Sequence, residues 1–92
     1  MYGWALLRPP AGQHGVSLSF EFEREYTPPV WPSVAGEQGT MTHLDIAVEN
    51  LEEAVAWALE VGARQAAFQP QQDVRVMLDP AGHPFCLFVA GT

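Results

Sequence analysis

Apolar and polar residues alternate most clearly over residues 16–23. Val16, Leu18, Phe20 and Phe22 fall on one face of this segment, and Ser17, Ser19, Glu21 and Glu23 fall on the other. An alternation of period two is typical of a half-buried strand. An apolar segment at residues 2–7 predicts an earlier strand, and the sequence RPPAG at residues 8–12 predicts a turn, because proline cannot extend a ladder.

A second alternation covers residues 42–48 and predicts a strand with two different faces. Leu44, Ile46 and Val48 form the apolar face, and His43, Asp45 and Ala47 form the other. Asn50 then suits a helix N-cap, with Glu53 placed as in a capping box. Apolar residues recur at helical spacing until Gly62, which suits the position just after a helix.

Three further strands are predicted after this helix, at residues 64–68, 74–78 and 84–90. The last two are joined by Asp79-Pro80-Ala81-Gly82, in which proline and glycine supply the dihedral angles of a tight turn. The chain is therefore expected to be α+β. The predicted sheet is curved and mostly antiparallel, with the helix on its outer face and a concave face opposite.

The pattern divides the chain into three parts. Residues 1–26 are predicted to form a partial module of strands only, residues 27–40 a linker rich in proline and glycine, and residues 41–92 a complete βαβββ module. The order of strand, helix and three strands in the last part follows from the periodicity alone.

Composition narrows the classes of partner. The chain has 92 residues, 11 acidic and 4 basic, with no lysine and a net charge of −7, so a phosphate backbone would be repelled. No apolar run approaches the roughly 20 residues of a membrane span, and the start lacks the layout of a signal peptide. We expect a cytoplasmic protein that binds neither nucleic acid nor membrane.

The segments HLDIAVENLEEAVAWALEVGA and FQPQQDVRVMLDPAGHPFCLF resemble the second module of glyoxalase-like proteins. These belong to the glyoxalase/bleomycin-resistance/extradiol-dioxygenase superfamily, also called vicinal oxygen chelate. WALLRPPAG, SLSFEFE and YTPPVWP resemble the end of a first module and the connection after it. Family members normally have a strand and a helix before this point, so the resemblance implies a truncated first module. An uncovered sheet edge and apolar face would follow, and we expect a homodimer.

The resemblance also implies divalent-metal ligands on the first and last strands of each module. His43 stands at the first-strand position, where its imidazole could bind Zn, Ni, Mn or Fe. Cys86 stands where a glutamate commonly follows the DPxG turn, and Glu21 lies at the matching place of the partial module. Each of these three candidate ligands also has a plainer interpretation. His43 could instead be hydrogen-bonded to Asp45 or to a backbone carbonyl, Glu21 could be an exposed carboxylate, and Cys86 could be a small buried thiol.

A small molecule in the concave face is the other predicted occupant. The residues expected to line its site are His43, Asp45, Arg75, Met77, Cys86 and Phe88. Arg75 would either clamp an anionic ligand or form a structural ion pair with Asp45. Asp79 and His83 belong to the turn and are assigned no catalytic role.

Three functions are compatible with these residues. The favoured hypothesis is a glyoxalase-like small-molecule-binding protein without an intact metal site. The second is a metal-dependent lyase or dioxygenase that uses His43 as a ligand. The third is a structural or dimerisation remnant without activity. No nucleophile–base set and no glycine-rich phosphate loop is visible, which argues against hydrolase and nucleotide-binding functions.

Overall fold

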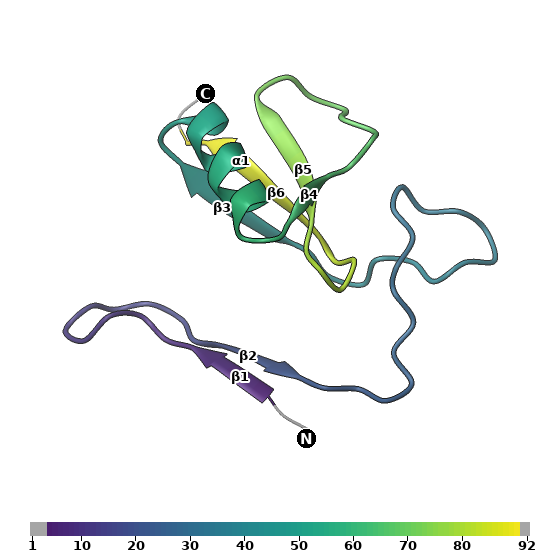
Figure 1. The fold of residues 1–92 in the computed structure, drawn as a ribbon, viewed down its shortest axis with the longest axis horizontal. Helices are drawn as coiled ribbons and strands as arrows, with labels where there is room; N and C mark the ends of the chain where they lie inside the picture. Colours follow the sequence, from purple (N-terminus) through teal and green to yellow (C-terminus); the bar gives the residue numbers. More distant parts are fainter. Residues whose placement is uncertain (1–3, 91–92) are drawn as a thin grey trace.

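The computed structural model describes residues 4–90, which contain one helix and two sheets (Figure 1). The elements are β1 (Trp4–Leu7), β2 (Leu18–Glu21), β3 (Leu44–Val48), α1 (Leu51–Glu60), β4 (Arg64–Gln65), β5 (Val74–Leu78) and β6 (Pro84–Val89). Strands β1 and β2 form an antiparallel hairpin. The other four strands form a sheet in the order β3-β6-β5-β4, in which β3 and β6 run parallel and the remaining pairs are antiparallel. The expected α+β fold is confirmed.

Four of the predicted strands, at residues 16–23, 42–48, 64–68 and 84–90, are shorter in the structure than the sequence suggested. The strand predicted at residues 16–23 spans Leu18–Glu21, and β1 begins at Trp4, with Tyr2 and Gly3 outside the described residues. The segment predicted at 64–68 pairs as a strand only over Arg64–Gln65.

The Gln69 side chain supplements the backbone pairing just beyond β4. Its Nε2 donates to the carbonyl oxygens of Val76 and Ala66, both at 2.9 Å, and its Oε1 accepts from the Val76 N–H at 2.8 Å. A side-chain amide can offer the same donor and acceptor as a peptide group. The Ala66 N–H also donates to the Val76 carbonyl at 3.0 Å, so the backbone groups of Val76 are satisfied by Gln69 and Ala66 together.

The helix begins and ends where the sequence predicted. The Asn50 side chain accepts a hydrogen bond from the Glu53 N–H at 3.0 Å, which satisfies one of the free amides of the first turn. At the other end Gly62 has a φ of +116°, a conformation that glycine adopts at little cost. These local signals fix the length of α1 and therefore the part of the sheet that it covers.

The core lies between α1 and one face of the four-stranded sheet. Ala58 of the helix, Met77 of β5 and Leu87 of β6 are its buried centre. Around them pack the partly buried residues Val48, Leu51, Ala54, Val55, Ala63 and Phe85. Because side chains alternate along a strand, Asp45 of β3 and Cys86 and Phe88 of β6 lie on the opposite, helix-free face. We call this the open face.

The β5–β6 turn is tied to the linker by a chain of polar contacts. Asp79 Oδ1 accepts from the backbone N–H groups of Ala81 at 3.0 Å and His83 at 2.8 Å, and Asp79 Oδ2 lies 2.9 Å from His83 Nδ1. The Tyr26 hydroxyl donates to the Ala81 carbonyl at 2.7 Å and lies 3.1 Å from His83 Nε2. Tyr26 therefore anchors the start of the linker to a turn 55 positions later in the chain.

The β1–β2 hairpin lies apart from the four-stranded sheet (Figure 1). Its two strands pack chiefly against each other, and large apolar side chains on both strands stay exposed, with Leu7 at 57% and Phe20 at 45% of full exposure.

Helix α1 has ten residues, and within residues 4–90 there is no helix with the length and apolar character needed to cross a bilayer.

Candidate functional site

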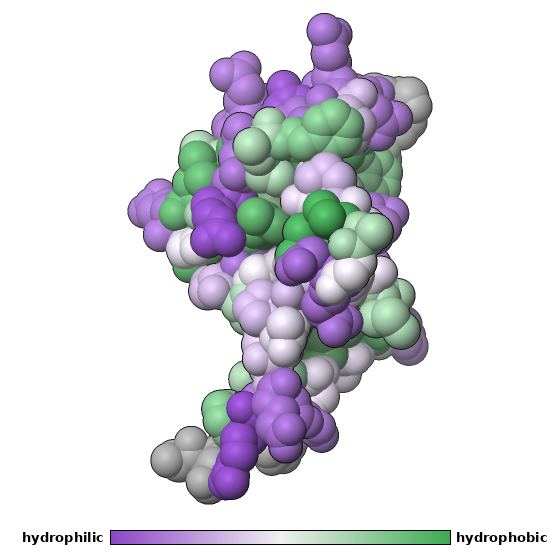
Figure 2. All heavy atoms as spheres, turned by 90° about the vertical axis from the view of Figure 1, so that its right-hand side faces the viewer, coloured by the Kyte–Doolittle hydropathy of each residue, from purple (hydrophilic) through white to green (hydrophobic). Residues whose placement is uncertain are grey.

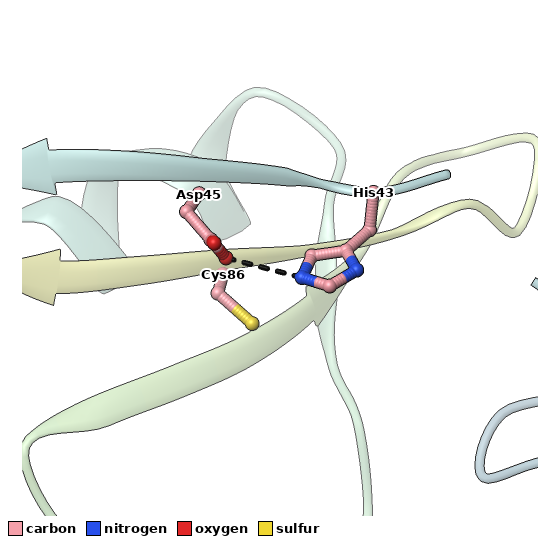
Figure 3. Close-up of side chains that lie close together, drawn as sticks. All are labelled: His43, Asp45 and Cys86. Atoms are coloured by element: carbon pink, nitrogen blue, oxygen red, sulfur yellow. Dashed lines mark ion pairs between the residues drawn. The ribbon is translucent and has the colours of Figure 1, made fainter. Parts of the chain in front are cut away.

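Three polar side chains converge on the open face where β3 lies beside β6. In the parallel register Asp45 is opposite Cys86, and His43 lies two residues before Asp45, on the same side. Figure 3 shows the imidazole turned toward the carboxylate, with the thiol beneath both. His43 Nε2 is 3.2 Å from Asp45 Oδ1, and one potential ligand atom from each of the three residues lies within 4.8 Å of the others. We call these residues the open-face cluster.

The surroundings of Cys86 favour its neutral thiol. Burial raises the pKa of Cys86, and the negative charge of Asp45 and a hydrogen bond to that carboxylate raise this pKa further. His43 and Asp45 are more exposed, with side chains at 48% and 60% of full exposure. The cluster therefore combines one shielded thiol with two groups that solvent or a ligand can reach.

The cluster borders an open hollow of about 520 Å³. Its lining residues are His43, Asp45, Gln71, Asp73, Val74, Cys86, Phe88 and Val89. This volume is within the range of about 300–1,000 Å³ that is common for small-molecule sites. The open-face cluster lies at one end of the hollow, and Val74 and Phe88, which pair in register, add apolar side chains at the other, beside the polar Gln71 and Asp73. The lining contains no arginine and, in a chain without lysine, no other permanent cation.

Two residues predicted to line the site lie on the other face of the sheet. Met77 is completely buried in the core beneath α1. Arg75 pairs in register with Leu87, on the helix side, and its Nη1 donates to the carbonyl oxygens of Gln72 at 2.6 Å and Val74 at 2.9 Å. The predicted placement of Arg75 and Met77 in the concave face is wrong.

Arg75 and Met77 were misplaced because β5 is buried on both of its faces. Cys86 pairs with Val76, so Val76 shares the open face, yet it is only 3% exposed, as buried as the residues beneath the helix. A strand that is covered on both faces shows no clear alternation from which its inner side can be read. The predicted Asp45–Arg75 ion pair fails with this placement, because Asp45 contacts His43 instead.

Glu21 does not join the open-face cluster. It lies on β2, opposite Trp4 in the hairpin, and it is exposed. Among the described residues, the group with metal-ligand geometry consists of His43, Asp45 and Cys86. Asp45 was predicted to contact a ligand but was not counted as a metal ligand. Its spacing from His43 in H-x-D was the available signal, since residues two apart share one face of a strand.

Fold and site together define a βαβββ protein of the glyoxalase type, with polar groups on the open face of its sheet. The sequence profile of a glyoxalase-like domain matches residues 2–88. The chain therefore belongs to the glyoxalase-like domain family, as its sequence motifs predicted. Searches of curated proteins and of solved structures gave no significant match.

Proposed function

We propose that this chain is a glyoxalase-like small-molecule-binding protein whose ligand lies in the open-face hollow. The observation that carries the proposal is the convergence of His43, Asp45 and Cys86 at one end of a hollow with an apolar wall. Ligand sites commonly combine an apolar lining with a few polar groups that fix the orientation of the ligand. The half-exposed imidazole and carboxylate would supply this orientation, and Phe88 would pack against the body of the ligand.

The charges around the hollow favour a neutral or cationic ligand. Asp45 and Asp73 line it, Arg75 lies on the other face of the sheet, and the whole chain carries a net charge of −7. An anion would lose its hydration without gaining a cationic partner, whereas an ammonium group donates a charge-assisted hydrogen bond to the Asp45 carboxylate. A flat aromatic amine would offer its ammonium group to Asp45 and its ring to Phe88.

A calorimetric titration with naphthylmethylamine and with naphthoate tests the proposal. We expect the amine to bind and the carboxylate not to bind, because the two share the aromatic body and differ in charge. Asp45→Asn should weaken amine binding about tenfold, since a hydrogen bond to a charged group contributes roughly 1.5–3 kcal/mol. Glu52→Gln, on the exposed side of α1, is the matched control. Equal binding of both compounds, or an equal loss in the control, would contradict the proposal.

A metal-dependent lyase or dioxygenase is the second candidate function, and the proximity of the cluster's ligand atoms favours it. Zinc bonds of about 2.0–2.3 Å place tetrahedral ligand atoms about 3.5 Å apart, so atoms within 4.8 Å need to move by roughly 1 Å. Imidazole, carboxylate and thiolate together suit Zn²⁺ better than a hard cation such as Mg²⁺. His43, Asp45 and Cys86 would hold the ion and leave a fourth position open, where it would polarise an oxygen of the substrate.

Native mass spectrometry of protein purified without chelator tests the metal site. The second candidate predicts one Zn, Ni, Mn or Fe ion per chain, lost in His43→Ala and retained in His14→Ala, which alters a histidine before β2. Binding must displace the Cys86 proton, so affinity should rise with pH. A metal-free mass after incubation with each ion would exclude this candidate and leave the binding function unaffected.

A further inference from the structure

We propose that Arg75 is a positioning residue that holds the segment 70–73 in place as a wall of the open-face hollow. The inference rests on the proposed ligand binding and deepens it, because it names a group that shapes the site without lining it. Segment 70–73 is the last part of the connection from β4 to β5, and its residues Gln71 and Asp73 line the hollow together with Val74. Arg75 itself starts on the helix side of β5.

Segment 70–73 is polar and open to solvent. All of its residues are exposed, and they belong to neither a helix nor a strand. The connection between β4 and β5 reaches the top of the molecule in Figure 1, and the side chains at that end in Figure 2 are mostly hydrophilic. A short exposed connection of this kind usually belongs to the more mobile parts of a chain. Burial contributes little to its order, so hydrogen bonds must supply it.

The Arg75 guanidinium binds three backbone carbonyl oxygens in and beside this segment. Its Nη1 donates to the carbonyl oxygens of Gln72 at 2.6 Å, Val74 at 2.9 Å and Gln71 at 3.4 Å. Hydrogen bonds from a charged donor are stronger than those between neutral groups. A single nitrogen atom therefore gathers the carbonyl oxygens of three of the four residues 71–74.

No carboxylate competes for this guanidinium in the part of the chain that the structure describes. The ion pairs within residues 4–90 are His43–Asp45 and His83–Asp79. The partial negative charges of the three carbonyl oxygens are therefore the groups that face the positive charge of Arg75. Without the guanidinium, these oxygens would need water as their donor, and their close arrangement around one nitrogen atom would open.

Gln69 fixes the other end of the segment. Its side-chain amide accepts from the Val76 N–H at 2.8 Å and donates to the Ala66 carbonyl at 2.9 Å. Side chains thus hold segment 70–73 from both ends, and the part between them lines the hollow. A wall that is ordered before the ligand arrives adds no ordering cost when the ligand binds. The contacts of Arg75 therefore favour ligand affinity by preorganising the site.

Replacing Arg75 separates its positioning role from its charge. Loss of the positive charge alone would strengthen the binding of an ammonium ligand, because less repulsion remains. Loss of the positioning contacts weakens the same binding, because the segment must then be ordered by the ligand. We therefore expect Arg75→Met to weaken naphthylmethylamine binding about fivefold in calorimetry, and Arg75→Lys, which keeps N–H donors, to recover part of the affinity. Arg64→Met removes the same charge from an exposed residue of β4 outside the hollow and is the matched control.

NMR relaxation of the free protein tests the order of the segment without any ligand. We expect the proton–nitrogen nuclear Overhauser effects of Gln71, Gln72 and Asp73 to fall in Arg75→Met, and those of residues 76–78 in β5 to stay unchanged. Unchanged values in the segment would overturn the proposal. An equal fall in β5 would also overturn it, because Arg75 would then act on the whole sheet.

The two measurements keep this proposal separate from the proposed function. If the unaltered chain bound no amine, the proposed function would fail, and the relaxation data would still decide whether Arg75 orders the segment. Stronger amine binding by Arg75→Met, or an equal weakening in Arg64→Met, would show that the guanidinium does not position the wall. Circular dichroism checks that each variant folds, and Arg75→Lys carries both measurements if Arg75→Met unfolds.

Discussion

Cys86 illustrates how one neighbour sets the chemistry of a residue. Burial and the adjacent Asp45 carboxylate both raise the pKa of the thiol, so the uncharged form prevails at neutral pH. Thiolate is the reactive form of cysteine. The free thiol is therefore expected to react slowly, although no disulfide protects it.

Asp45→Asn should make Cys86 react faster with iodoacetamide. The substitution removes a negative charge and a hydrogen bond that both stabilise the protonated thiol, so the pKa falls and more thiolate is present at pH 8. The rate is measured in chelator-treated protein by mass spectrometry. Asp73→Asn, at the same hollow, is the control and should change the rate less. A rate that is unchanged or slower in Asp45→Asn would contradict this account of the thiol.

Met77 and Met41 form a natural pair for testing the core. Met77 is completely buried and Met41 is 89% exposed. Met77→Ala should lower the free energy of unfolding by about 2–5 kcal/mol, because it leaves a cavity under α1. Met41→Ala should change it by less than about 0.5 kcal/mol. Urea denaturation measures both, and similar losses in the two variants would contradict the assignment of Met77 to the core.

The sequence predicted the placement of individual residues on the sheet only in part. His43, Asp45, Cys86 and Phe88 lie on the open face as expected, because β3 alternates clearly and β6 pairs with it in register. Arg75 and Met77 were misplaced because β5 is covered on both faces. The contact between His43 and Asp45 was one of the predicted alternatives. Cys86 lies beside these two residues because β3 and β6 pair in parallel, and the spacing of residues in the sequence does not reveal this pairing.

At the scale of elements, the N-cap of α1 is a direct link between sequence and structure. Asn50→Ala should reduce the free energy of unfolding by about 1 kcal/mol, because the Glu53 N–H loses its acceptor. Asn50→Asp keeps an oxygen in the same place and should retain most of the stability. Thermal denaturation compares the three proteins. A loss as large in Asn50→Asp as in Asn50→Ala would show that the cap does not account for the effect.

The contact between Tyr26 and the β5–β6 turn should control how firmly the linker is held. Tyr26→Phe removes the hydroxyl that donates to the Ala81 carbonyl, so the chain near Arg24 should open more often. Faster tryptic cleavage after Arg24 measures this opening, and cleavage after Arg64, in β4, is the internal control. If both sites were cleaved faster by the same factor, the hydroxyl would act on global stability and not on the linker.

Most elements could be predicted from the sequence because their signals are local. Alternation, the Asn50 cap, Gly62 and the Asp79–Gly82 turn each report on a few neighbouring residues. The short β4 was the exception, since Gln69 completes the hydrogen bonds that backbone pairing would have supplied. This replacement depends on a side-chain conformation, which periodicity does not contain.

At the scale of the whole molecule, the sheet separates two surfaces with different chemistry. The open face carries the polar cluster and the hollow, and the helix side carries the core and, beyond α1, an apolar groove lined by Leu18, Phe20, Leu44 and Ile46. The alternation of residues 42–48 in the sequence indicated both surfaces. The position of the hairpin relative to the sheet could not be predicted from the sequence and is seen only in the structure.

An amide NMR titration with naphthylmethylamine tests most directly whether the open face is the binding site. We expect the largest shift changes on Asp45, Val74, Cys86 and Phe88, around the hollow, and we expect them to shrink in Asp45→Asn. Shift changes concentrated on Leu18, Phe20, Leu44 and Ile46 would instead place the ligand in the groove, and the absence of any saturable change would contradict binding of this class of ligand altogether.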